Sequence, residues 1–206
     1  MITVIDSGIA NIGSVLSACD RIGIPTTVTT DPASVRSASA LILPGVGAFS
    51  DGMDSLRRHE LVQPICEAAV AGVPILGICL GMQLFAEVSE EFGEHEGLGL
   101  IAGRVVRLNA SIPSERVPNI GWCDVTVAEN VRLFAGIESG STFYFVHSYH
   151  FTCTSPEDSV GTIAFGTGAV SIAVERGNIF GVQFHPEKSQ DMGLTLLDNF
   201  AQLLNV

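Results

Sequence analysis

Basic residues are scarce in this sequence. Ten Lys and Arg stand against 22 Asp and Glu among 206 residues, which gives a formal net charge of −12. A chain that binds nucleic acid or an anionic membrane surface needs clustered positive charge, and the ten basic residues form no cluster. We therefore expect neither kind of partner.

Long apolar runs and paired cysteines are also lacking. No apolar stretch reaches the roughly 20 residues that a helix needs to cross a bilayer, and the first residues lack the basic segment of a secretion signal. The five cysteines are odd in number, widely spaced and without a C-x-x-C pair. This pattern favours a reduced chain over a disulfide framework, so we expect a cytoplasmic location.

The distribution of apolar residues predicts a single domain over residues 1–206. Short apolar runs at 2–5 and 40–43 and a run rich in β-branched residues at 26–30 alternate with segments of helical period, as in a series of β-α-β units. After residue 97 the apolar runs are short and closely spaced, which is typical of antiparallel strands. The predicted fold class is α/β, with an open, mostly parallel sheet flanked by helices and added antiparallel strands.

Two segments complicate this pattern. Residues 53–71 have a helical period but contain Pro64, so we expect a kink at the proline or two helices. An acidic cluster follows in the middle of the chain, which we interpret as a solvated helix end and loop. Its members are Glu87, Glu90, Glu91, Glu94 and Glu96.

A cysteine between two glycines stands in the most informative segment. Residues 74–83 read PILGICLGMQ, which predicts a buried strand, a tight turn and a helix continuing to Ala86. Gly77 and Gly81 would allow the sharp turn, and Cys79 would lie at a helix N-terminus, where the macrodipole favours a thiolate. We predict a nucleophilic cysteine. The alternative is a buried structural cysteine between two packing glycines.

A histidine close to a carboxylate provides the second part of this chemistry. His185 and Glu187 are two residues apart, so on an extended strand they would project to the same side. A carboxylate beside an imidazole fixes its tautomer and stabilises the imidazolium, as in a nucleophile–base–acid triad. Cys79, His185 and Glu187 are therefore the predicted catalytic residues. The alternative for His185 is a histidine satisfied at a turn.

Amide hydrolysis through a cysteine also needs hydrogen-bond donors for the oxyanion. Leu80 follows the predicted nucleophile, and its backbone N–H is one candidate. Gly45, Val46 and Gly47 follow a predicted strand, where glycine lets the backbone turn an N–H group towards a ligand. The alternative for these three residues is an ordinary turn.

Two motifs resemble the class I, or triad-type, glutamine amidotransferases: GICLGMQ at residues 77–83 and QFHPE at 183–187. Further segments narrow the resemblance to the glutaminase subunits of imidazole glycerol phosphate synthase, from histidine biosynthesis. They are PGVGAF at 44–49, PNIGW at 118–122, YFVHSY at 144–149 and HPEKS at 185–189. The resemblance runs nearly end to end and implies a flavodoxin-like open sheet.

The resemblance implies hydrolysis of L-glutamine to glutamate and ammonia without a cofactor. It also implies the residues of the glutamine pocket. Gln83 is the family's side-chain contact to glutamine, and Ser148 and Tyr149 match its contacts to the α-amino and carboxylate groups. Gly47 is expected at the same pocket.

Delivery of ammonia requires an acceptor site. The sequence shows no phosphate loop, dinucleotide fingerprint or second domain for an acceptor, so we expect the acceptor on a partner. The resemblance implies a heterodimer with a (β/α)₈-barrel cyclase that makes imidazole glycerol phosphate and AICAR. Asn11, Trp122, Tyr144 and Lys188 match family positions at or near that interface. Core or surface packing is the alternative for these four residues.

Other functions stay open at this point. A paralogous amidotransferase subunit would supply ammonia to a surface-sugar biosynthetic enzyme, and Cys123 and His150 depart from the family pattern near the implied interface. A free-standing cysteine hydrolase would need no partner, and a binding module would need no reactive thiol. We expect no metal site at His147, His150 and Cys153, with Cys123 as a further candidate ligand, because side chains three apart on a strand face opposite ways.

Overall fold

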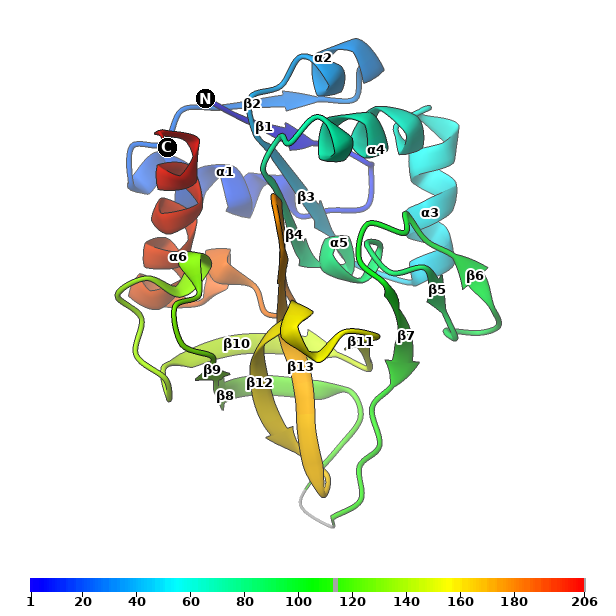
Figure 1. Ribbon diagram of the computed structural model, residues 1–206, viewed down its shortest axis with the longest axis vertical. Helices are drawn as coiled ribbons and strands as arrows, with labels where there is room; N and C mark the ends of the chain where they lie inside the picture. Colours follow the sequence, from blue (N-terminus) through cyan, green and yellow to red (C-terminus); the bar gives the residue numbers. More distant parts are fainter. Residues whose placement is uncertain (113–114, 206) are drawn as a thin grey trace.

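The chain folds around an eight-stranded sheet, and the computed structural model describes residues 1–112 and 115–205 (Figure 1). The strand order is β2-β1-β3-β4-β14-β13-β12-β9, and all pairs from β2 to β14 are parallel. The pairs beyond β14 are antiparallel. The parallel strands are β1 (Ile2–Ile5), β2 (Thr26–Thr29), β3 (Leu41–Gly45), β4 (Ile75–Cys79) and β14 (Ile179–Val182).

Most of the antiparallel strands lie in the second half of the chain. The large sheet ends with β13 (Gly168–Arg176), β12 (Ser159–Phe165) and β9 (Thr126–Val127). Two smaller sheets accompany it: an antiparallel pair of β8 (Asn119–Asp124) with β10 (Thr142–His147), and a four-stranded sheet in the order β11-β7-β5-β6. The strands of this four-stranded sheet are β11 (Tyr149–Cys153), β7 (Gly103–Arg107), β5 (Val88–Ser89) and β6 (His95–Glu96). The predicted fold class is confirmed.

Helices cover both faces of the large sheet (Figure 1). One face carries α1 (Ile12–Arg21) and α6 (Gln190–Gln202), and the other carries α2 (Pro32–Arg36), α3 (Phe49–Arg58) and α4 (Val62–Val70). A short α5 (Leu80–Gln83) follows β4 directly. The 3-10 helices are η1 (Arg132–Phe134), η2 (Pro156–Asp158), η3 (Pro186–Lys188) and η4 (Leu203–Asn205).

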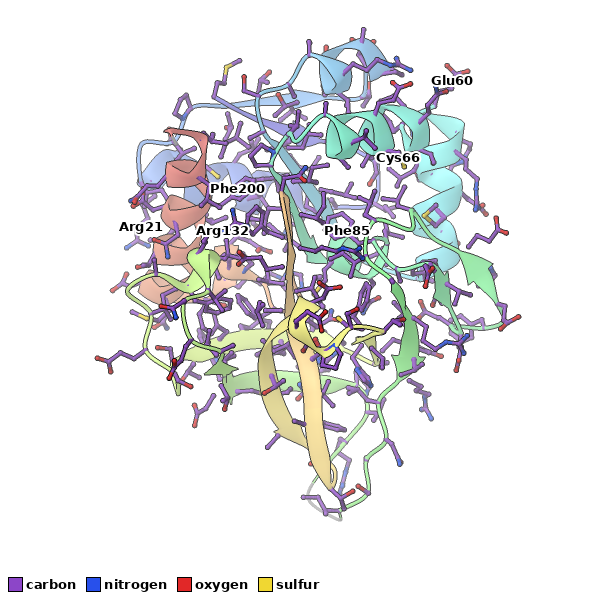
Figure 2. All side chains as sticks on the ribbon, viewed as in Figure 1. Arg21, Glu60, Cys66, Phe85, Arg132 and Phe200 are labelled. Atoms are coloured by element: carbon purple, nitrogen blue, oxygen red, sulfur yellow. The ribbon has the colours of Figure 1, made fainter. Side chains whose placement is uncertain are left out.

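The core consists of two apolar clusters, one on each face of the sheet, because side chains alternate along a strand. Leu76 of β4 packs with Phe200 of α6, whereas its neighbour Ile75 packs on the opposite face with Phe85. Figure 2 shows Phe200 and Phe85 on opposite sides of β4. None of the helices in the described ranges is long and apolar enough to span a bilayer.

The helical segment predicted at 53–71 divides into two helices, but not at Pro64. The break falls at residues 59–61, where Glu60 adopts a φ of 57°. Pro64 lies in the first turn of α4. Backbone N–H groups in a first turn have no partner within the helix, so the N–H that proline lacks is not missed there.

Two glycines let α5 approach the sheet closely. A Cβ atom on Gly81 would lie 1.8 Å from the carbonyl oxygen of Leu43, and one on Gly77 would lie 2.6 Å from a ring carbon of Phe85. Neither glycine has a positive φ; that conformation belongs to Cys79, at 55°. The sequence therefore predicted the tight turn correctly, but the glycines supply space, and Cys79 itself carries the unusual backbone.

Gly81→Ala tests this close approach. Because the new methyl group would overlap a backbone carbonyl, we expect the free energy of unfolding to fall by about 3 kcal/mol or more. Gly13→Ala is the matched control, since Gly13 lies in α1 with nothing within 4 Å of an added Cβ. The control should stabilise by about 0.5–1 kcal/mol. Equal effects in urea unfolding would contradict the interpretation.

Candidate active site

The predicted site residues gather at a cavity of about 250 Å³ at the carboxyl ends of β3 and β4. Ligands bind preferentially at this edge of an open α/β sheet. Gly45 is not among the residues that line the cavity, but it pairs with Cys79 across β3 and β4. The predicted residues that line the cavity are Val46, Gly47, Cys79, Leu80, Gln83, Ser148, Tyr149 and His185.

Cys79 is the last residue of β4 and is 7% exposed. The helix after it was predicted to reach Ala86, but α5 ends at Gln83 and has four residues. A helix macrodipole is the sum over aligned peptide units. A helix of this length therefore contributes little of the stabilisation expected for a thiolate. Support for an ionised Cys79 must therefore come from side chains around it.

His185 and Glu187 form a buried pair. Nδ1 of His185 lies 2.8 Å from Oε1 of Glu187, and each side chain is 3% exposed. The prediction that both lie on an extended strand is wrong, because β14 ends at Val182 and Glu187 belongs to η3. The 3-10 turn brings the carboxylate onto the ring instead.

The surroundings of His185 favour its protonated form. Burial lowers the pKa of His185, but interactions with Cys79 and Glu187 outweigh burial and raise the pKa to about 9. Nε2 makes no hydrogen bond of ordinary geometry among the described residues. One ring nitrogen is therefore held by Glu187, and the other is available for proton exchange with Cys79.

The predicted oxyanion donors differ in where their N–H groups point. Leu80 opens α5 and lines the cavity. The N–H of Val46 donates instead to the carbonyl oxygen of Ile9 at 2.8 Å, away from a ligand in the cavity. Gly47 has a φ of 102°, a conformation that favours glycine.

Gln83 is held by two hydrogen bonds from its Nε2 atom. One goes to the carbonyl oxygen of Tyr149 at 3.0 Å and the other to Oε1 of Gln183 at 2.8 Å. Its Oε1 is an acceptor that no hydrogen bond among the described residues uses. Ser148 and Tyr149 line the cavity at the junction of β10 and β11.

Sequence reasoning missed two residues at this site. Gln183 is fully buried, and its Nε2 donates to Sγ of Cys79 at 3.6 Å. Glu91, interpreted as part of a solvated acidic cluster, lines the cavity, and its Oε2 accepts the N–H of Phe49 at 2.6 Å. Gln183 stood inside the QFHPE motif and could have been found there, whereas nothing in the acidic run distinguishes Glu91.

Three of the four predicted interface residues contact one another. The rings of Trp122 and Tyr144, paired across β8 and β10, meet edge-on with centroids 5.8 Å apart. Nζ of Lys188 lies 5.9 Å from the centroid of the Tyr144 ring. Asn11 lines a separate cavity that Glu187 also borders.

The ring nitrogens of His147 are both engaged by protein groups. Nδ1 lies 2.9 Å from the carbonyl oxygen of Tyr149, so it carries the hydrogen, and Nε2 accepts from Nδ2 of Asn119 at 3.1 Å. Burial lowers the pKa of His147 to about 4. His147 is therefore neutral near pH 7 and oriented by the backbone.

Comparison with known proteins agrees with this fold and cavity. Residues 3–203 match the family model described as Glutamine amidotransferase class-I. A solved structure described as a glutamine amidotransferase superposes with a TM-score of 0.76 at 18% identity, covering 100% of this chain and 99% of that one. The chain belongs to the class-I glutamine amidotransferase family.

Two full-length relatives narrow the assignment. The imidazole glycerol phosphate synthase subunit HisH of Moorella thermoacetica is 48% identical over 98% of this chain and 95% of its own length. The protein of the same name from Sulfurimonas denitrificans is 47% identical, with 100% of both chains covered. Within the family, this chain falls in the group of imidazole glycerol phosphate synthase subunits named HisH.

The other four cysteines provide a test of the site. Burial raises the pKa of Cys66 and Cys123, that of Cys19 to about 11 and that of Cys153 to about 12. Alkylation by iodoacetamide requires a thiolate. At pH 7 we therefore expect modification at Cys79 first, measured by peptide mass spectrometry. Faster modification at any of the four other cysteines would exclude Cys79 as the reactive thiol.

Proposed function

We propose that this chain hydrolyses glutamine to glutamate and ammonia through a triad of Cys79, His185 and Glu187. The observation that carries the proposal is the 2.8 Å contact of His185 with Glu187, which leaves Nε2 free on the side of Cys79. The proposal treats residues 1–206 as one amidotransferase domain, as the sequence predicts.

The chemistry runs in two halves. The Cys79 thiolate attacks the side-chain amide carbon of glutamine, and the imidazolium of His185 gives its proton to the departing nitrogen as the C–N bond breaks. Ammonia departs, and the γ-glutamyl group remains on Cys79 as a thioester. Water then attacks, His185 takes a proton from it, and the C–S bond breaks to release glutamate and restore the thiolate. Glu187 holds the ring and stabilises the imidazolium throughout.

The cavity offers groups that suit the α-amino end of glutamine. The unused Oε1 of Gln83 and the carboxylate of Glu91 both line it and both attract an ammonium group. Ser148 and Tyr149 line the same cavity, and the family resemblance implies that they contact the α-amino and carboxylate groups. Gly47 leaves room beside them.

The oxyanion site is incomplete as it stands. Leu80 can donate from the start of α5, but the N–H of Val46 is bonded to Ile9. Loss of one oxyanion donor costs on the order of 10²–10³ in kcat. We therefore propose that the isolated chain is a nearly silent glutaminase and that Gly45 and Gly47 let the segment turn towards the substrate.

A partner protein would shift the segment of Gly45, Val46 and Gly47 towards the orientation in which its N–H faces the substrate. The outer face of the β8–β10 strand pair is largely apolar and exposed, although the inner face supplies buried phenylalanines to the core. Its exposed members include Ile120, Trp122 and Val146. An exposed apolar patch of this kind marks a protein interface. We propose that the partner is the cyclase subunit of imidazole glycerol phosphate synthase, a (β/α)₈ barrel that uses the ammonia to make imidazole glycerol phosphate and AICAR.

The HisH names of the relatives favour this partner over the enzyme of surface-sugar biosynthesis that a paralogous subunit would serve. The residues proposed to meet the cyclase are Asn11, Trp122, Tyr144 and Lys188. Asn11 and Glu187 border one cavity. Contact at Asn11 would therefore lie close to the triad.

The partner proposal is tested by steady-state glutamate formation. We expect the chain alone to be slower by on the order of 10²–10³ than the chain with cyclase and an acceptor-site ligand. Ile120→Asp should abolish the stimulation, because it puts a charge on the apolar face. Val28→Asp, a change at an exposed valine of the distant edge strand β2, is the control. Full activity of the isolated chain would instead support a free-standing hydrolase.

Glu187→Gln tests the triad in the stimulated complex. We expect kcat to fall by on the order of 10²–10⁴ with little change in KM, because orientation of the imidazole acts on the transition state. The carboxylate also helps to raise the pKa of His185, so its removal should move the alkaline limit of kcat to lower pH.

Glu157→Gln is the matched control for this change, since Glu157 also follows a proline in a 3-10 helix, η2. It should leave kcat and its pH dependence unaltered. A raised KM with a normal kcat in Glu187→Gln would make Glu187 a binding residue and remove it from the triad.

A further inference from the structure

Gln183 lies between the proposed nucleophile and the proposed glutamine pocket. Its buried side chain donates from Nε2 to Sγ of Cys79 at 3.6 Å and accepts at Oε1 from Nε2 of Gln83 at 2.8 Å. The sheet register puts it there. Val182 pairs with Ile78 across β14 and β4, so the next residues of the two strands are neighbours at the carboxyl edge.

The hydrogen bonds from Gln83 through Gln183 to Cys79 run in one direction, because each amide donates to the next group. Nε2 of Gln83 donates both hydrogens, one to Gln183 and one to the carbonyl oxygen of Tyr149. The same carbonyl accepts Nδ1–H of His147, and Asn119 donates to the other nitrogen of that ring. Reversing the amide of Gln183 would set N–H against N–H at Gln83 and oxygen against sulfur at Cys79. The contacts therefore fix its orientation.

The network beyond Gln183 carries no charge near neutral pH. Burial lowers the pKa of His147 to about 4, so its ring is neutral, and the remaining members are amides and a carbonyl. Cys79 is the end whose charge changes during the proposed reaction. A hydrogen bond to an ionised acceptor is roughly twice as strong as one between neutral groups.

We infer that Gln183 is a positioning residue with two tasks, an inference that rests on the function proposed above. Its N–H favours the thiolate of Cys79 over the thiol and over the thioester sulfur. Its Oε1 holds the amide of Gln83 with both hydrogens engaged, so that the free oxygen faces the ligand. One buried side chain thus couples ionisation of the nucleophile to affinity for glutamine.

The thiolate task acts in both halves of the reaction. The hydrogen bond raises the fraction of Cys79 that can attack, and it strengthens again when the C–S bond of the thioester breaks and sulfur becomes an anion. The other titratable groups on the cavity wall are His185, with Glu187 behind it, Glu91, the neutral His147 and the phenol of Tyr149. Substitution of Gln183 leaves all of these in place.

The test uses the whole chain and iodoacetamide. The rate of Cys79 alkylation is measured against pH, and its suppression by glutamine gives the half-protecting concentration. Gln183→Met keeps the length of the side chain but removes both hydrogen bonds. A bond to an ionised group has the strength to change the rate at pH 7 by about tenfold. For Gln183→Met we therefore expect Cys79 to be alkylated about tenfold more slowly at pH 7 and the midpoint of the rate–pH profile to lie about one pH unit higher. We also expect weaker protection by glutamine.

Gln183→Glu separates the two tasks. A carboxylate still accepts from Gln83 but presents no amide N–H to the sulfur. Protection by glutamine should stay nearer to that of the wild type than in Gln183→Met, while the pH profile moves upward. If Gln183→Glu and Gln183→Met raised the half-protecting glutamine concentration equally, the proposed role of Oε1 in holding Gln83 would be contradicted.

Asn199→Leu is the control for simple loss of stability. Asn199 is another buried amide, whose Nδ2 donates to the carbonyl oxygens of Leu133 and Ala135 on the far side of the core. This variant should unfold at lower temperature yet keep the wild-type pH profile and protection. Equal shifts in the control and in Gln183→Met would reduce Gln183 to a packing residue.

The wild-type chain separates failure of this inference from failure of the proposed function. If glutamine gives it no protection, the proposed function fails, whatever Gln183 does. If glutamine protects the wild type, but Gln183→Met shows the wild-type midpoint and half-protecting concentration, the inference is overturned and the proposed function stands.

Discussion

The close approach of α5 to the sheet is the constraint on which the site depends. The backbone of Gly81 lies so near the carbonyl oxygen of Leu43 that no Cβ atom fits between them. The chain must therefore turn within one residue after β4, and Cys79 takes the positive φ that this turn requires. The thiol is thus presented at the carboxyl edge of β3 and β4 by packing rather than by a long helix behind it.

The central position of β14 brings the remaining chemistry to that edge. This strand comes from the last third of the chain but pairs with β4 in the middle of the sheet. The register that sets Val182 beside Ile78 also sets Gln183 beside Cys79, and the 3-10 turn of η3 then folds Glu187 back onto His185. The proposed nucleophile and the proposed proton shuttle come from two separate segments, which meet only because the sheet joins their strands.

The sequence predicted those parts of the molecule that local patterns determine. Alternating strands and helices gave the sheet, and two motifs gave Cys79, His185 and Glu187, which the fold brings to one edge. It could not predict features that depend on contacts between distant segments. In the sequence, nothing distinguishes Glu91 from its acidic neighbours. Only the fold shows that it accepts the N–H of Phe49, at the start of α3. The break between α3 and α4 likewise depends on Glu60, which no helix propensity distinguishes.

The direction of the Val46 N–H is the feature that sequence patterns predict least, and the proposed regulation depends on it. A glycine on each side makes the peptide easy to turn, but only the carbonyl of Ile9 decides which orientation is stable in the isolated chain. Ile9 and Asn11 lie on the same stretch between β1 and α1. A partner that contacts Asn11 therefore acts two residues from the acceptor that holds Val46. Such a partner shifts the orientation only by binding the active form more tightly than the resting form, and weakening the Val46–Ile9 hydrogen bond is one local way to achieve this.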